Sequence, residues 1–306
     1  MEEKMILQRL AFSKYLLQKG NMETVNPEPI SSVSILNYHD ALEFAFDLVL
    51  TDKGIGSNNL SFMQYFDKIN EWLKTNEKTE ISLRPSLEKL KDRRVNLKHR
   101  GIFSSKTDIE ESKFTANTLF EELCKNVYEL DIKDISLVEL VNNARVKDFI
   151  KEAIATYPSD QKTSIEKLSL AFEFLLRDYE QSKRDRFRNS PFNFGKKMTF
   201  LSSSQIGLDP NNRLSEFIDK TKESIEAMQK AIKILAFGLD YRKYIKFRLL
   251  IPEPMWFGGD DMPKVHLSNN ATIYQNDLDF CVGYLIECAL KLQEFDFEIE
   301  DGRFHE

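Results

Sequence analysis

The sequence predicts a mainly α-helical protein, in which a helical bundle is followed by a second helical domain with a small antiparallel β-sheet. The 306 residues include only 11 Gly and 9 Pro, while Leu, Lys and Glu, which favour helices, are abundant. Apolar residues recur at the helical period along most of the chain. One segment, residues 241–252, instead alternates its side chains as a half-buried strand does.

Five helices are predicted in the first half of the chain. The first is expected to stop at Gly20. After a linker with two prolines, Ser31 and Ser32 are candidate N-caps for a second helix that is apolar on most sides. The fourth helix begins after Pro85 and ends before Gly101. The five predicted ranges are 3–18, 33–50, 59–74, 86–100 and 106–130.

The second half adds further helices and the strand-like segment. Ser136 and Glu139 have capping-box spacing, which predicts a helix from Ser136 to about Thr156. The later helices are expected at about 165–179, 212–239 and 277–295. The segment 241–252 is expected to form a strand with a basic outer face, paired with residues 263–267 and 271–275. We therefore expect a helical domain over residues 1–156 and a second domain with the sheet over residues 157–306.

Composition limits the possible functions. The net charge is −6, so any contact with a polyanion must be local. Three cysteines without metal-site or disulfide-framework spacing fit a reducing compartment. No segment approaches the roughly 20 apolar residues that cross a bilayer, and the N-terminus does not resemble a signal peptide. These features predict a cytoplasmic protein without a membrane partner.

Basic residues are concentrated in LKDRRVNLKHRGIF, residues 90–103. Arg94 could hold two phosphate oxygens at once, and His99 could move a proton to or from a ribose hydroxyl near neutral pH. With Asn96 to orient them, these groups suffice for cleavage of RNA without a metal or cofactor, because the 2′-hydroxyl attacks its own phosphate. The candidate RNA-binding residues beside them are Arg93, Lys98 and Arg100.

The spacing of Arg94 and His99 restricts how they meet. Positions five apart on a helix lie about 140° apart around its axis, so the two residues do not share one face. Either the long arginine side chain reaches round the helix, or two copies of the helix meet across an isologous dimer and combine their groups.

At this stretch the chain resembles the HEPN family (higher eukaryotes and prokaryotes nucleotide-binding domains). A helical region with an arginine, four to six residues and then a histidine is the family's pattern, and RVNLKH matches it at Arg94, Asn96, Lys98 and His99. Val95 departs from it, since a polar residue often follows the arginine. The resemblance covers residues 31–123. It implies a helical bundle that dimerises to form a composite ribonuclease cleft, which leaves 2′,3′-cyclic phosphate ends, and a role as a phage-defence or toxin effector.

Two other interpretations stay open. Cations at a helix C-terminus complement the helix dipole without any further role. A HEPN-like fold without activity would use the same basic end to bind a partner protein, a nucleotide or RNA. If the protein is a nuclease, the second domain is expected to regulate its activity, with a possible regulatory protein partner, or to bind substrate.

A second group of candidates lies in HDALE. His39 and Glu43 are four residues apart and share a helix face. Two ligands at this spacing begin a metal site, but a third donor is not evident, so no metal is expected. Instead, His39 is expected in the core or beside His99, with Asp40 and Glu43 orienting the catalytic cations.

A third group lies in SKRDRFRNSPFNFGKK, residues 182–197, where cations and phenylalanines interleave. Cations for the backbone and aromatic faces for unstacked bases suit single-stranded RNA. A solvated helix end with phenylalanines packed back onto the protein explains the same pattern. The candidate RNA-binding residues here are Arg184, Arg186 and Arg188.

Overall fold

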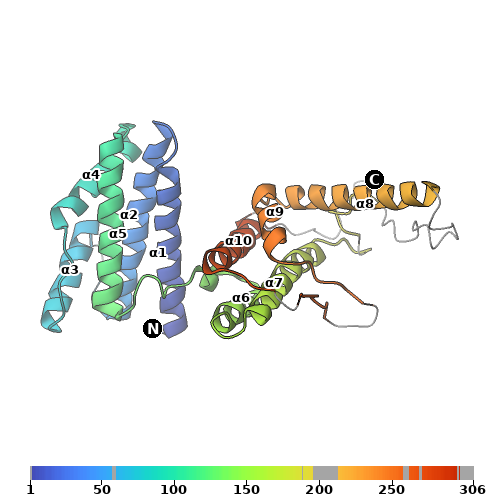
Figure 1. The fold of residues 1–306 in the computed structure, drawn as a ribbon. Coiled ribbons are helices and arrows are strands. Elements are labelled where there is room, and N and C mark those ends of the chain that lie inside the picture. Colours follow the sequence, from blue (N-terminus) through green and yellow to red (C-terminus); the bar gives the residue numbers. More distant parts are fainter. Residues whose placement is uncertain are drawn as a thin grey trace. The chain divides into compact units, whose positions relative to one another are not determined.

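The computed structural model describes residues 2–56, 60–187, 189–195, 213–257, 262–268, 271–294 and 296. These residues form helices and loops without a β-strand, so the prediction of a mainly α protein is confirmed. The chain divides into two compact units, Met1–Leu140 and Val141–Glu306 (Figure 1).

The first unit is a helical bundle built around one central, buried helix. Its helices are α1 (Glu3–Glu23), α2 (Val33–Asp52), α3 (Phe62–Thr75), α4 (Arg84–Arg100) and α5 (Lys106–Tyr128), with 3-10 turns at Ile30–Ser32 and Leu137–Leu140. Helix α2 contacts each of the other four helices (Figure 1). Its side chains Tyr38, Leu42 and Phe46 are fully buried, which explains why its sequence is apolar on most sides.

The expectation that the first helix stops at Gly20 is wrong, because Gly20 lies inside α1. A Cβ atom at this position would come within 2.7 Å of Cε1 of Tyr38 on α2. The glycine therefore permits the close approach of α1 and α2. By contrast, α4 is confirmed with Pro85 in its first turn and Gly101 at its end, where φ is 64°.

The second unit contains α6 (Ala144–Thr156), α7 (Gln161–Ser182), α8 (Arg213–Ala236), α9 (Tyr241–Leu250) and α10 (Gln275–Glu294). Its core is aromatic: the Phe172 ring of α7 stacks on Tyr244 of α9 and Tyr284 of α10. The predicted helix 136–156 is interrupted, because Asn143 caps α6 by accepting a hydrogen bond from the backbone N–H of Val146. Helix α6 packs on α7. The boundary between the units therefore lies after Leu140 rather than near Tyr157.

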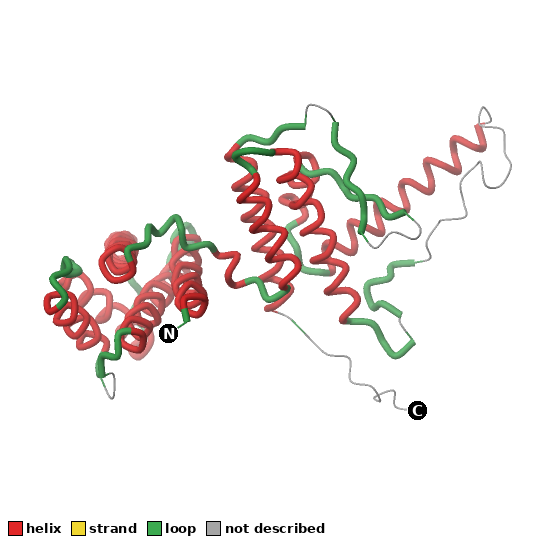
Figure 2. Tube along the Cα trace, turned by 90° about the horizontal axis from the view of Figure 1, so that it is seen from below, coloured by secondary structure: helices red, strands yellow, loops and turns green. Residues whose placement is uncertain are grey.

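The predicted antiparallel sheet is wrong, since no described segment is a strand (Figure 2). Residues 241–250 form α9. The carboxylate of Asp240 accepts hydrogen bonds from the backbone N–H groups of Arg242 and Lys243, which starts the helix. Tyr244 and Phe247, three residues apart, then bury one helical face. An isolated antiparallel bridge joins Lys264 to Met255, which lies outside the predicted strand, so it is not the expected pairing.

Candidate functional site

The basic stretch forms the second half of α4, and its last turn is exposed. Leu87 and Leu90 are fully buried and anchor the first half of the helix in the core of its unit. The last-turn residues Lys98, His99 and Arg100 are exposed. Cations there complement the negative end of the helix dipole, so their position alone does not identify a function.

Arg93 is held by the neighbouring helix. Its guanidinium donates to Oγ of Ser112 at 3.0 Å, to Oδ1 of Asp108 at 2.6 Å and to Oε2 of Glu111 at 2.6 Å. Its side chain is 15% exposed. All three partners lie on α5, so Arg93 joins α4 to α5, and its donors are occupied by the protein itself.

Arg94, the next residue, faces α2 and is only partly satisfied. Its Nη2 lies 3.9 Å from Oδ1 of Asp40, which is longer than a hydrogen bond. Its Nε is buried without a hydrogen-bond partner. Buried donors are nearly always paired in folded proteins. The bundle therefore leaves part of the hydrogen-bonding capacity of Arg94 unused.

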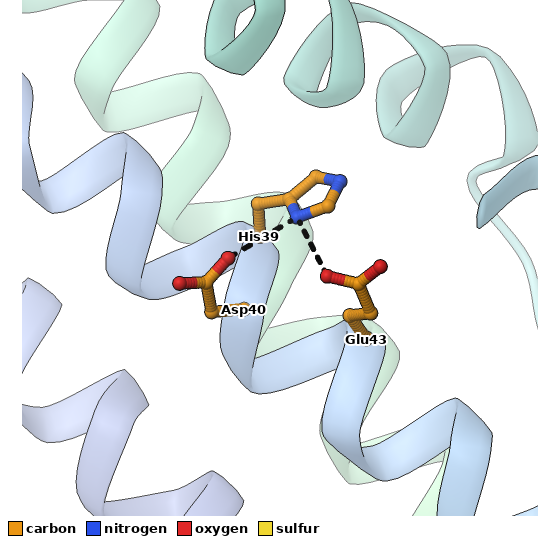
Figure 3. A group of neighbouring side chains, drawn as sticks. All are labelled: His39, Asp40 and Glu43. Atoms are coloured by element: carbon orange, nitrogen blue, oxygen red, sulfur yellow. Dashed lines mark ion pairs between the residues drawn. The ribbon is translucent and has the colours of Figure 1, made fainter. Parts of the chain in front are cut away.

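Beside Arg94, three neighbouring side chains of α2 converge on one point (Figure 3). Nδ1 of His39 lies 3.5 Å from Oδ1 of Asp40 and 3.7 Å from Oε2 of Glu43. His39 is 3% exposed, and its ring packs on that of Phe62 at 4.1 Å. Its Nδ1 has no hydrogen-bond partner. The expectation that His39 lies in the core is thus met, but its polar edge points at two carboxylates.

The environment of Asp40 favours its charged form. Contact with His39 is the largest cause that lowers the pKa of this carboxyl; burial opposes it, and the charges of Arg94 and Lys98 lower it further. Asp40 is therefore an anion at neutral pH. It lies between His39 on its own helix and Arg94 of α4. That Asp40 orients catalytic cations stays a prediction.

His99 stands apart from this cluster. It is exposed, and it makes no hydrogen bond or ion pair within the part of the chain that the structure describes. Asn96, expected to orient the catalytic groups, accepts a hydrogen bond from Nη1 of Arg100 at 3.2 Å. Within one bundle, Arg94 is thus joined to Asp40, while His99 faces solvent.

The second basic stretch follows α7. Lys183 is 3% exposed, pairs with Asp296 and lies over the ring of Tyr179. Arg184 and Arg186 are exposed, and the Arg186 guanidinium stacks on the ring of the next residue, Phe187, at 4.7 Å. The remaining predicted cation, Arg188, lies outside the described residues.

One feature of the second unit was not expected from the sequence. A pocket of about 430 Å³ lies among α7, α8 and α9. On its wall, Arg248 stacks over Phe172 at 4.7 Å, while Lys233 pairs with Glu180 at 2.8 Å. The pocket could not be predicted from the sequence, because residues 241–252, which include α9, were expected to form a strand. The pocket also carries carboxylates against its cations, so it has no marked preference for an anion.

Nucleophilic chemistry at cysteine receives no support. The three cysteines, Cys124, Cys281 and Cys288, are buried, and burial raises the pKa of each thiol to about 12. Because the thiolate is the reactive form, they are poor nucleophiles at neutral pH. No helix in the described ranges is both long and apolar enough to cross a membrane.

Comparisons with known proteins add no assignment to this geometry. No family model, no curated protein and no solved structure matches the chain.

Proposed function

We propose that this protein is a metal-independent endoribonuclease of HEPN type that acts as a homodimer. The supporting observation is at the basic end of α4. The Nε of Arg94 has no hydrogen-bond partner. Five residues later, His99 is exposed and makes no hydrogen bond or ion pair with the described residues of its own bundle. These are the cation and the proton-transfer group that cleavage of RNA by its own 2′-hydroxyl requires.

Each group has one role. His99 either accepts the proton of the attacking 2′-hydroxyl or donates a proton to the leaving 5′-oxygen. Arg94 stabilises the negative charge that develops on the phosphate, while Asp40 holds the guanidinium from the α2 side. Lys98 and Arg100 bind the RNA backbone, with Asn96 positioning Arg100. Arg93 has its donors occupied by α5, so it supports the helix rather than the substrate.

A dimer is part of the proposal because one α4 helix directs the two groups apart. Residues five apart lie about 140° apart around the axis, and Arg94 contacts α2, whereas His99 is exposed. In an isologous dimer, His99 of one protomer meets Arg94 of the other, and symmetry repeats the pair. Such a dimer has two composite sites.

The test is incubation of the purified protein with total RNA in EDTA, followed by detection of 2′,3′-cyclic phosphate ends. We expect the wild type to cleave, and His99→Ala to lower the rate by about 10²- to 10⁴-fold, the usual contribution of a general acid or base. His266→Ala is the matched control, because His266 is also exposed but lies in the second unit. It should cleave like the wild type.

Equal cleavage by His99→Ala would remove the proposal. Intact RNA in a stable complex with the wild type would favour the alternative, a helical module that binds RNA, a nucleotide or a partner protein. As a nuclease of this type, the protein would serve in the cytoplasm as a phage-defence or toxin effector. The second unit, with exposed Arg184 and Arg186, would bind RNA or a regulatory partner.

A further inference from the structure

The α2 cluster of His39, Asp40 and Glu43 contains a feature that the proposed nuclease does not need. One donor atom from each of these side chains lies within 4.8 Å of the other two. The imidazole is almost fully buried, yet its Nδ1 has no hydrogen-bond partner and points at the carboxylates (Figure 3). An unsatisfied polar atom in the interior calls for an explanation.

We propose that these three side chains form a binding site for a divalent transition-metal ion of the Zn²⁺ class. Zn²⁺ binds imidazole nitrogen and carboxylate oxygen at about 2.0–2.2 Å, and open sites use three protein ligands with water in the fourth position. Tetrahedral donors at these bond lengths lie roughly 3.4 Å apart. The observed distances from Nδ1 of His39, 3.5 Å and 3.7 Å, are close to that separation.

The chemistry of the donors selects the class of ion. Mg²⁺ and Ca²⁺ prefer sites made of oxygen ligands, whereas an imidazole combined with carboxylates suits Zn²⁺ and its neighbours. The two carboxylates carry −2 against a neutral imidazole, which balances the charge of a divalent ion. Their side chains are 46% and 45% exposed, so the site is open to solvent on the carboxylate side.

The surroundings hold the nitrogen ligand in place. The His39 ring packs against the Phe62 ring, tilted by 30° with the ring centroids 4.1 Å apart, and this contact holds it in the core between α2 and α3. The nearest competing cation is Arg94, whose Nη2 lies 3.9 Å from Oδ1 of Asp40. That contact is longer than a hydrogen bond, so an ion that takes Asp40 as a ligand displaces little.

The experiment uses the full-length protein without a histidine tag, treated with EDTA and then desalted. Zn²⁺ is titrated by calorimetry, and Co²⁺ by the visible d–d absorption that reports its coordination. We expect one ion of either metal per chain and no comparable binding of Mg²⁺. Saturable binding of Mg²⁺ with the same affinity would contradict the assignment to the Zn²⁺ class.

Variants locate the ion. Asp40→Asn and Glu43→Gln each remove a ligand and should weaken binding by more than the roughly 10- to 100-fold that loss of an outer-shell partner costs. Asp47→Asn is the matched control: Asp47 is on the same helix and 44% exposed, but it pairs with Arg9. It should bind like the wild type. All three positions are partly exposed, and circular dichroism will confirm that the variants fold.

Absence of saturable binding to the wild type would overturn the proposal, as would binding that Asp40→Asn and Glu43→Gln retain in full. The inference rests on α2 alone and does not depend on the proposed nuclease. RNA cleavage in EDTA decides the nuclease, while the metal titration requires no RNA, so either can fail without the other.

Discussion

The last turn of α4 and the segment after α7 both carry several cations, and they hold them in different ways. At the end of α4, the cations extend from a helix that Leu87 and Leu90 anchor in the core, and they remain exposed. After α7, Lys183 is folded into the unit against Tyr179 and Asp296. The adjoining Asp185 accepts backbone hydrogen bonds from Phe187 and Asn189, which makes a closed turn.

The number of cations in a stretch therefore says little about how many of them are available to bind a ligand. Arg93 and Arg94 show this within one helix. Nη2 of Arg93 lies 2.6 Å from a carboxylate oxygen of each of two acids on α5, and it forms ion pairs with both. Arg94 has one carboxylate at 3.9 Å. A charge-assisted hydrogen bond needs a short distance, so the placement of acids on neighbouring helices decides which cation stays available.

Among the variants that test this comparison of Arg93 with Arg94 and of the two basic segments, Arg94→Ala should have the largest effect. It should lower the rate of RNA cleavage by about 10²- to 10³-fold, as removal of one group that stabilises developing charge does in other enzymes. Thermal unfolding should change little, because Arg94 makes only a long contact with Asp40. The rate and the unfolding temperature are measured on the same preparation. If Arg94→Ala cleaves RNA at the wild-type rate, the available guanidinium of Arg94 has no catalytic role.

Arg93→Ala should show the opposite balance. It removes the hydrogen bonds to Ser112 and Asp108, and we expect the free energy of unfolding to fall by about 1–3 kcal/mol, since solvent screens the half-exposed acids. Once the loss of stability is corrected for, cleavage should be nearly normal. Urea unfolding at pH 7 measures the change.

The pH dependence of unfolding tests which contact of Arg93 causes this loss of stability. Hydrogen bonding to Ser105, followed by the charge of Arg93, lowers the pKa of Asp108 below its ordinary value of 3.8, against the opposing effect of burial. A carboxyl whose pKa is lowered by folding stabilises the protein above that ordinary value and loses this contribution as the pH falls through the folded-state pKa. The stability difference between wild type and Arg93→Ala should therefore shrink below pH 3.8. A difference that is constant with pH would exclude the Asp108 contact as its cause.

The smallest effect is expected after α7. If Arg184 and Arg186 each meet one phosphate of single-stranded RNA, each alanine variant should reduce the slope of log K against log salt by about 0.7. Cleavage at saturating RNA should not change, because neither residue contacts the reacting groups in our proposal. Filter binding at several salt concentrations measures the slope. An unchanged slope in both variants would leave this segment as a helix end without an RNA-binding role.

The sequence predicted the helices well where long apolar patterns and strong end signals agreed, as in α4 between Pro85 and Gly101. It failed at α9, because basic and apolar residues also alternate there, and the decisive N-cap, Asp240, precedes the pattern by one residue. The prediction that Gly20 ends the first helix is wrong for a related reason. The glycine is required by the close approach of Tyr38, which lies on another helix. Contacts between distant segments cannot be read from local spacing.

The candidate site was predicted in part for the same reason. Residue type and spacing singled out Arg94, His39 and Glu43, and the structure brings Asp40 between them through contacts at 3.5 and 3.9 Å. The sequence did not reveal that Arg93 is bound to α5, nor that Asp40 supplies a third donor beside His39. The first fact depends on how α4 packs on α5, and the second depends on the side-chain conformations of neighbouring residues within α2.

Mixing two inactive variants shows whether two copies of α4 together build the nuclease site. Arg94→Ala and His99→Ala protomers are denatured together, refolded as mixed dimers and assayed with RNA in EDTA. In a composite site, each mixed dimer has one intact pair out of two. Random pairing makes about half of the dimers mixed, so we expect about a quarter of the wild-type activity to return. No recovery from mixed dimers, when each wild-type control refolds to full activity, would contradict it.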